Sequence, residues 1–398
     1  MTATLDEPTV PVTGRWIAAL SAAVLGMSLA VLPTIQVLLP LQVEEIDPAG
    51  KVTSLAWITL LAAVVSMAVC PIAGALSDRT TSRFGRRRPW VLGSGVVCAV
   101  ALVAQSGQHS LAGVAVTWMI VQAGTNSLYA ALTASVPDLV PVPQRGTVSA
   151  FVGLPTPLAL ILGSFLLSSL VTGRFAGYCL LAGLLLALIV PFVLNAADSP
   201  RRTPPARTPL RFTHDLGWAF GSRLGIQLAN ALGTLYLLYY LRDIVHHPDP
   251  AKAVFLLIAV YTAGIVLTSV VAGRWSDRSG RRKPFVVASA AVVAAAMVVL
   301  SVAHTFSWAL VAAGLMGVGY GVYLAVDNAL ITQVLPAAGS RARDLGVINL
   351  ANTAPQALAA AIAGLVISEL GGYSPLYLLA AACALGGAVA IGPVRAVR

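Results

Sequence analysis

The stretch Gly74-Ala-Leu-Ser-Asp78-Arg79, which continues to Gly85-Arg-Arg-Arg-Pro89, occurs twice in this sequence. Its second copy reads Gly273-Arg-Trp-Ser-Asp277-Arg278 and continues to Gly280-Arg-Arg-Lys-Pro284. The two aspartates are 199 residues apart, which is half the length of the 398-residue chain. An internal repeat of this length predicts two structurally related halves. We expect residues 1–197 and 214–398 to form these halves, joined by a proline- and arginine-rich linker at 198–213.

The sequence around both copies is too apolar for a water-soluble fold. Hydrophobic residues make up 58% of the chain and charged residues 10%, against roughly 45–50% and 25% in soluble domains. Ten stretches lack Asp, Glu, Lys and Arg altogether, and the stretches from Pro89 and from Pro284 are each long enough for two membrane helices of about 20 residues. The sequence therefore predicts an all-α integral membrane protein with twelve transmembrane helices in two six-helix bundles.

The basic residues predict how the chain crosses the membrane. When alternate loops are assigned to two sides, one side receives 20 of the 25 lysines and arginines and the other side receives four. Basic residues concentrate in cytoplasmic loops, so we expect a multi-pass protein of the cell membrane with both termini in the cytoplasm. The acidic residues Glu44, Glu45 and Asp47 fall in a loop on the opposite side, where we expect them to be solvated.

Several functions are disfavoured by what the sequence lacks. The segments between the expected spans are too short for a catalytic domain with its own core, and no lysine stands in a Walker phosphate loop. Neither HExxH nor CxxC occurs, so we expect no metal, no cofactor and no catalytic residue. The basic residues are divided among short loops, which disfavours nucleic-acid binding. A membrane enzyme would need facing deep acids or histidines, and a channel would need a ring of like charges.

The paired signature, the twelve expected helices and the basic linker resemble the major facilitator superfamily over the whole chain. The longer first copy, Ser77 to Pro89, resembles the sucrose transporters and the glycoside-pentoside-hexuronide cation symporters, as does Pro137-Asp138-Leu-Val-Pro141 followed by Gln144-Arg145-Gly146. The segment Gly153-Leu-Pro155-Thr-Pro157 does not fit the helix-5 element of many drug/proton antiporters. The resemblance implies a secondary transporter that moves a small molecule by alternating access, and we expect a monomer.

The repeated signature is expected to act as a conformational latch. Aspartates beside clustered arginines at helix ends can pair when the cytoplasmic ends of the two halves are together, which biases the conformational equilibrium. The alternative is that these charges only set the topology. The residues assigned to the latch are Gly74, Asp78, Arg79, Gly85, Arg86, Asp277, Arg278, Gly280 and Arg281.

Polar residues recur at helical spacing inside several expected spans. In the superfamily, helices 1, 4, 7 and 10 line the central cavity, and here helices 4 and 7 carry polar residues at i, i+4, i+7 and i+11, which share one face. The alternative is that such stripes hold helices together. Amide, hydroxyl and aromatic groups suit a neutral, hydroxylated solute such as a sugar. The expected substrate-binding residues are Gln36, Gln122, Asn126, Tyr129, Gln227, Asn230, Tyr320, Tyr323, Asn328, Asn352 and Gln356.

Two full charges, Arg223 and Asp327, lie inside expected spans, where ionisable residues are functional candidates. Their expected depths, about 13 Å and about 9 Å from the cytoplasmic ends of helices 7 and 10, would let them meet. We expect Asp327 to carry a proton and Arg223 to link its protonation to cavity opening. The alternative is a permanent salt bridge between the two helices.

The expected function is symport of a sugar or glycoside, driven by a proton or sodium gradient, with the proton favoured as the coupling ion. The alternative is proton-coupled efflux of a small metabolite or drug, because the direction of transport does not follow from the fold.

Overall fold

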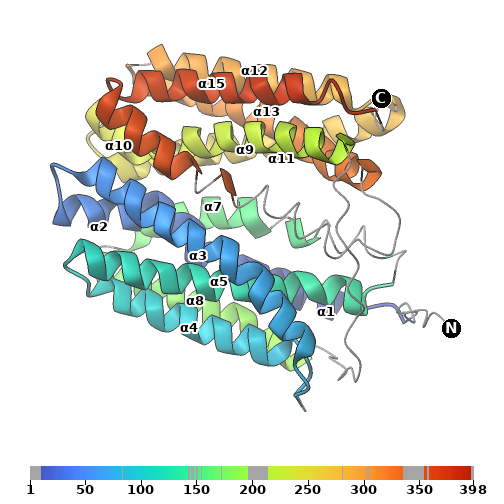
Figure 1. The fold of residues 1–398 in the computed structure, drawn as a ribbon. Coiled ribbons are helices and arrows are strands. Elements are labelled where there is room, and N and C mark those ends of the chain that lie inside the picture. The colour runs from blue at the N-terminus through green and yellow to red at the C-terminus, as the bar shows by residue number, and fades with distance from the viewer. Residues whose placement is uncertain are drawn as a thin grey trace. The chain divides into compact units, whose positions relative to one another are not determined.

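The described part of the chain is helical throughout and contains no β-strand (Figure 1). In this computed structural model the described residues are 10–395, apart from 83, 142–143, 145–147, 149–150, 154, 172, 196–213, 280, 303, 335–353 and 356–357. The chain divides into two compact units, which are considered separately below.

The first unit comprises Met1–Leu38 and Val64–Ala206. Within it α1 packs against α7 and α8, and α4 packs against α5 and α8. Small residues allow these close approaches, as at Gly124 of α5, where an added Cβ would lie 3.1 Å from the Ser94 carbonyl oxygen. The helical elements of this unit are α1 (Gly14–Pro33), the π-helix η1 (Thr34–Leu38), the later part of α3 (Lys51–Arg79), α4 (Arg88–Ser106), α5 (Leu111–Leu139), α7 (Pro155–Phe165), the π-helix η2 (Leu166–Leu170) and α8 (Arg174–Asn195).

The second unit comprises Leu39–Ala63 and Arg207–Arg398. Here α13 packs against α11 and α12, while α15 packs against α9 and α12 (Figure 1). The contact of α11 with α13 is again made over glycine, since a Cβ on Gly317 would lie 2.2 Å from the Tyr261 carbonyl oxygen. The helices of this unit are α2 (Leu39–Ile46), the first part of α3, α9 (His214–Leu235), α10 (Leu237–Asp243), α11 (Pro250–Ser279), α12 (Lys283–Val302), α13 (Phe306–Val334), Leu358–Glu369 and α15 (Tyr373–Ala390).

The helices have the length and surface of membrane spans. Among the described residues, nine are long and apolar enough to cross a bilayer, and α9 with α10, which are bent by 45° at a short break, form a tenth candidate. Large apolar side chains face outward, including Leu194, Leu267 and Val389, each more than 70% exposed. Such extensive exposed apolar surface suits lipid rather than water.

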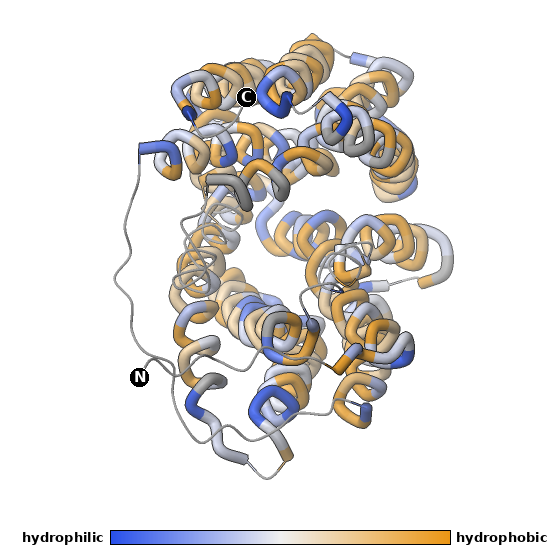
Figure 2. The backbone as a smooth tube through the Cα atoms, turned by 90° about the vertical axis from the view of Figure 1, so that its right-hand side faces the viewer, coloured by the Kyte–Doolittle hydropathy of each residue, from blue (hydrophilic) through white to orange (hydrophobic). Residues whose placement is uncertain are grey.

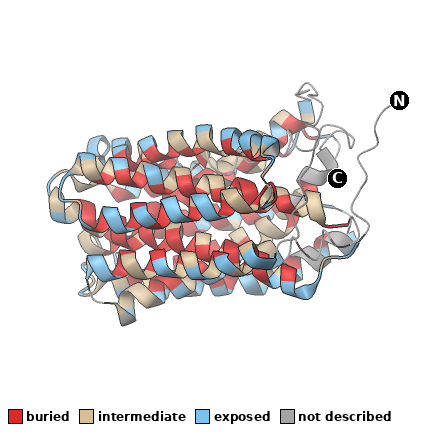
Figure 3. Ribbon diagram, turned by 90° about the horizontal axis from the view of Figure 1, so that it is seen from below, coloured by how far each residue is buried: buried red, intermediate tan, exposed pale blue. Residues whose placement is uncertain are grey.

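Within each unit, hydrophobic residues continue around the helices (Figure 2), and the buried residues lie where helices face one another (Figure 3). The predicted all-α membrane architecture is therefore confirmed. Described helix occurs in all twelve expected spans, although the eleventh is represented mainly by Leu358–Glu369 because 335–353 lie outside the described residues.

The two units do not follow the predicted boundary in one respect. Leu39–Ala63 belongs to the first half of the sequence repeat, yet it groups with the second unit. The predicted linker, 198–213, lies outside the described residues. The division of the repeat into residues 1–197 and 214–398 stays a prediction.

Candidate functional site

A buried ion pair joins α9 and α13 in the second unit. Arg223 Nη2 lies 3.3 Å from Asp327 Oδ2, and the two side chains are only 9% and 8% exposed. Arg223 stands on the side of α9 that faces α13, and Asp327 stands on the side of α13 that faces α9. We call Arg223, Asp327 and their polar neighbours Gln227, Tyr320 and Tyr323 the Arg223 cluster.

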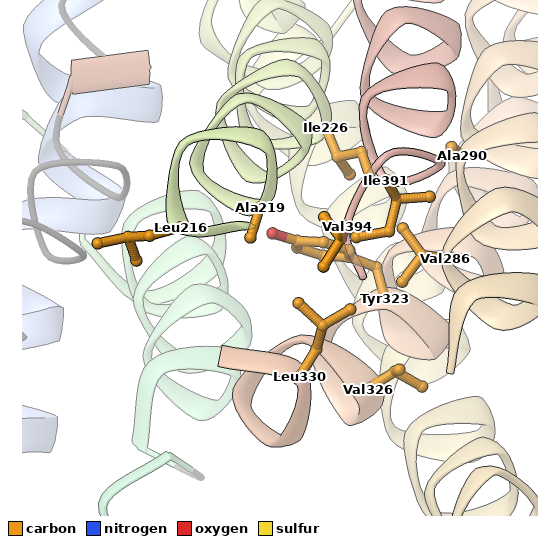
Figure 4. Packing of buried hydrophobic residues seen from close by; sticks show 10 residues of the cluster. All are labelled: Leu216, Ala219, Ile226, Val286, Ala290, Tyr323, Val326, Leu330, Ile391 and Val394. Carbon is orange, nitrogen blue, oxygen red and sulfur yellow. The ribbon is translucent and has the colours of Figure 1, made fainter. Parts of the chain in front are cut away.

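Apolar side chains surround this cluster. Figure 4 shows Ala219 and Ile226 of α9, Val286 and Ala290 of α12 and Ile391 packed around Tyr323. The Tyr323 ring extends from α13 toward α9, and its hydroxyl lies on the side of Ala219, one helical turn from Arg223 (Figure 4). A charge pair in such surroundings interacts through a low local dielectric, so a change in either charge has a large energetic effect.

The polar face of α9 makes two further hydrogen bonds beyond the ion pair, to tyrosines of α13 and α11. Tyr320 donates from its hydroxyl to Gln227 Oε1 at 2.5 Å, and Tyr261 donates to Asn230 Oδ1 at 2.8 Å. The rings of Tyr261 and Tyr320 stack with centroids 6.2 Å apart. Predicted residues from helices 7 and 10 therefore do meet in one place.

Tyr261 is part of this network, although the sequence offered no sign of it. It lies on α11, is 7% exposed, and links Asn230 to Tyr320 by a hydrogen bond and a ring contact. Tyr261 is flanked mainly by apolar residues in α11, which lacks a polar stripe like that of α9, so periodicity did not point to it.

Some expected site residues of the second half cannot be placed. Asn352 and Gln356 lie outside the described residues, as does the side chain of Asn328. Their assignment to the substrate site stays a prediction.

The expected substrate residues of the first half lie in the first unit. Gln122, Asn126 and Tyr129 are partly buried on α5, where Asn126 donates from Nδ2 to the Gln122 carbonyl oxygen at 2.8 Å. Gln36 lies on η1, and its Oε1 is buried without a hydrogen-bond partner among the described residues. π-helical turns within α-helices occur frequently at functional sites, and a buried polar group without a partner calls for an explanation.

The repeated signature makes its described ion pairs within the first unit. Arg86 and Arg87 both pair with Asp138 near the end of α5, with Arg87 Nη2 at 2.9 Å. Arg87 also donates to the Ser77 hydroxyl at 2.5 Å. Arg87 and Asp138 are not among the expected latch residues; the sequence singles out Asp138 only as part of the segment Pro137–Pro141. These contacts tie the loop between α3 and α4 to α5.

The expected latch itself stays a prediction. Arg79, Arg278 and Arg281 are exposed, whereas the side chains of Asp78 and Asp277 and the whole of Gly280 lie outside the described residues. Gly74 lies within α3 and Gly85 in the loop that follows it.

Gly85 has a backbone conformation that disfavours other residues, with φ of 94°. We expect Gly85→Ala to lower the free energy of unfolding by about 1–3 kcal/mol because the alanine Cβ is strained at this φ. Gly74→Ala is the matched control, since Gly74 is helical and an added Cβ meets nothing within 4 Å. In thermal unfolding in detergent, Gly85→Ala should have a lower Tm than the wild type, whereas Gly74→Ala should not. Equal Tm values for the two variants would contradict the strain argument.

A second charged cluster lies in the second unit, and it corrects an expectation. Lys51 Nζ pairs with Glu44 at 2.9 Å and with Asp243 at 2.7 Å, and Arg242 also pairs with Glu44. The Tyr373 hydroxyl donates to Asp243 at 2.8 Å. Glu44, expected to be solvated, is instead only 16% exposed. We call these five residues the Lys51 cluster; they connect the corner between α2 and α3 with α10 and α15.

Asp47, in the same corner, has a different role. Its carboxylate accepts hydrogen bonds from the Ser54 hydroxyl at 2.7 Å and the Gly50 amide at 2.9 Å. These bonds to the charged form hold the pKa of Asp47 below its ordinary value. The residue thereby stabilises the turn into α3.

A double-mutant cycle on the Lys51 cluster should detect a coupled pair. We expect Lys51→Met and Asp243→Asn each to destabilise the protein, and the double variant to lose about 1 kcal/mol less than the sum, because the two changes remove the same ion pair. Chemical unfolding of the four proteins measures this difference. Additive effects would mean that the pair at 2.7 Å contributes no net stability.

No group of three or more His, Cys, Asp or Glu side chains that could hold a metal ion occurs in the part of the chain that the structure describes.

Comparisons with known proteins agree with this architecture. The family described as "Major Facilitator Superfamily" matches residues 12–241 and 228–396. A crystal structure of a mutant of the peptide transporter POT superposes with a TM-score of 0.77, covering 96% of each chain at 14% sequence identity, which shows a shared fold. No curated protein matches the sequence. Because the family match extends over nearly the whole chain, the protein belongs to the Major Facilitator Superfamily and is a multi-pass secondary transporter of a small molecule.

Proposed function

We propose that this transporter couples the movement of a sugar or glycoside to the movement of protons in the same direction, by alternating access. The Arg223–Asp327 pair is the observation that carries the proposal, because it places one ionisable carboxyl inside the apolar part of a helical bundle. Ionisable side chains at such positions mark proton relays or ion pathways in membrane proteins.

Asp327 suits a proton carrier because each of its two protonation states is favoured by a different feature of its surroundings. The charged form is held by Arg223, whereas the neutral form is favoured by removal from water. A change in the distance between α9 and α13 would shift this balance, and the protonation state would in turn favour one conformation. Proton binding and conformational change are then linked reciprocally.

The neighbouring groups support a hydroxylated solute. Gln227, Asn230, Tyr320 and Tyr261 combine amide and phenol groups on adjoining faces of α9, α13 and α11. Amides and phenols can exchange their mutual hydrogen bonds for bonds to solute hydroxyls, and the tyrosine rings offer surfaces for sugar faces. We propose that the polar face of α5, with Gln122, Asn126 and Tyr129, also contributes to binding.

The excess of basic residues on one side supports a further part of the proposal, that both termini lie in the cytoplasm and that the membrane is the cell membrane. We propose that the protein acts as a monomer.

Uptake into proteoliposomes tests the proposed function. Labelled sugars and glycosides should accumulate against their gradient when the outside is acidic, and a protonophore should abolish the accumulation. A sodium gradient without a pH gradient should not drive accumulation. Absence of sugar flux under every gradient would contradict the proposal and would favour efflux of another small molecule.

A further inference from the structure

The two halves of the sequence repeat differ at two positions near the signature. Leu76 in α3 corresponds to Trp275 in α11. Asp138 in α5 corresponds to Gln333 in α13, since each is the next-to-last residue of its helix. The second half therefore has an indole where the first has an aliphatic side chain, and a neutral amide where the first has a carboxylate.

The carboxylate of the first half holds the signature arginines in the interior. Arg86 and Arg87 are 6% and 4% exposed, and both pair with Asp138. In the second half the residue that corresponds to Arg86 is Arg281, and it is exposed, as is Arg278 at the end of α11. The second unit thus presents positive charge on its surface where the first unit has buried it.

One face of α11 changes from apolar to basic along its length. Leu267, Val271 and Trp275 follow one another at four-residue spacing and are 71%, 63% and 65% exposed. Arg278 stands three residues further along, in the last turn of the helix, about 4.5 Å beyond Trp275 along the helix axis. Apolar residues, then an indole and then a cation match the environments of a membrane leaflet from its acyl chains to its phosphates.

The start of α12 adjoins this face of α11. The rings of Trp275 and Phe285 meet edge to face with centroids 5.5 Å apart, which holds the indole beside the first turn of α12. Arg281 lies two residues before α12, at the positive end of the helix dipole. We call Trp275, Arg278, Arg281 and Phe285 the Trp275 patch.

We propose that the Trp275 patch binds an anionic phospholipid, with the lipid phosphate at Arg278 and Arg281 and the acyl chains along the exposed face of α11. Charge complementarity selects this occupant, because five residues between Gly273 and Pro284 are basic and one is acidic, and basic residues beside a membrane span attract anionic lipids. A zwitterionic lipid has the same phosphate but adds a cation that the arginines repel. The proposal does not depend on which solute is transported.

Quenching by brominated lipids tests the proposal. Purified protein in detergent is titrated with phosphatidylglycerol or with phosphatidylcholine that has the same brominated chains, and bromine quenches the indoles that it contacts. The difference between the wild type and Trp275→Leu, which has the residue of the first half, isolates the signal of Trp275. We expect half-maximal quenching of Trp275 at an at least about fivefold lower mole fraction of phosphatidylglycerol than of phosphatidylcholine.

Removal of the two arginines should abolish this preference. In Arg278→Gln/Arg281→Gln the two half-maximal mole fractions should agree within about twofold. Arg15→Gln is the matched control and should keep the preference, since Arg15 is also exposed near the start of a helix but lies next to the buried Trp16. Arg281→Gln, which changes a residue outside the helices, should reduce the preference by at least about twofold and carries the measurement if the double variant does not fold.

Three results would overturn the proposal. These are equal half-maximal mole fractions of the two lipids with the wild-type protein, a preference that survives the loss of the arginines, and displacement of phosphatidylglycerol by an equal concentration of its soluble headgroup, glycerophosphoglycerol. The last result would mean that the patch binds a free phosphate compound rather than a membrane lipid. Because every readout measures lipid binding and none measures transport, failure here leaves the proposed symport standing, and failure of the symport leaves the lipid site standing.

Discussion

Asp327→Asn is expected to abolish uphill transport while leaving solute exchange intact. The amide has the shape of the protonated acid but cannot release a proton, so the pH gradient no longer drives accumulation. We expect accumulation to fall by at least about tenfold, which corresponds to a loss of about 1.4 kcal/mol of coupling. Proteoliposomes with labelled solute on both sides measure exchange, and an imposed pH gradient measures accumulation.

The control for this variant is Asp249→Asn, the same chemical change at a side chain that is 44% exposed and paired with Lys252. It should keep both exchange and accumulation. Wild-type pH dependence in Asp327→Asn would exclude Asp327 as the proton carrier. Loss of exchange together with loss of stability would instead support the alternative, in which Arg223 and Asp327 form a permanent structural salt bridge.

The fold could be predicted from the sequence because its two strongest signals are long-range and simple. Uncharged stretches of about 20 residues or more indicate membrane helices, and the repeat of Gly74–Arg79 at Gly273–Arg278 indicated two halves. The break between α9 and α10 around Tyr236 was not predicted, since no proline marks it. The local composition of a segment indicates that it forms a helix, but it does not indicate the position at which that helix bends.

The site could be predicted in part for the same reason. Helical spacing placed Arg223 and Gln227 on one face of α9, and depth in the membrane distinguished Asp327 from the other acids. Pairings between charged residues in loops and at helix ends were missed, because neither residue of such a pair is unusual in its own loop. Glu44 meets Arg242 although 198 residues separate them, and solvation was the natural expectation for each alone.

The role of Asp138 could not be predicted for the same reason, because its partners lie about 50 residues away in sequence. Arg86 and Arg87 are 6% and 4% exposed, and both direct a guanidinium at this one carboxylate. Two buried positive charges at one site repel each other unless a negative charge lies between them. Asp138 thus lets the basic loop between α3 and α4 pack against α5 rather than extend into water.

Asp138→Asn should therefore destabilise the protein by about 2–3 kcal/mol. This is less than the roughly 3–5 kcal/mol for a fully buried pair, because the Asp138 side chain is 20% exposed and solvent screens part of its charge. Unfolding in detergent measures the change, with Asp249→Asn as the control, expected to lose no more than about 1 kcal/mol.

The reason for the loss can be separated from its size by a second change. If unpaired positive charge causes the destabilisation, Arg86→Gln in the Asp138→Asn background should restore part of the lost stability, since it removes one of two repelling guanidinium groups. If the loss came from the hydrogen bonds alone, the double variant should be less stable than Asp138→Asn. The sign of that single difference decides whether the signature loop is held to α5 by charge compensation or by hydrogen-bond geometry.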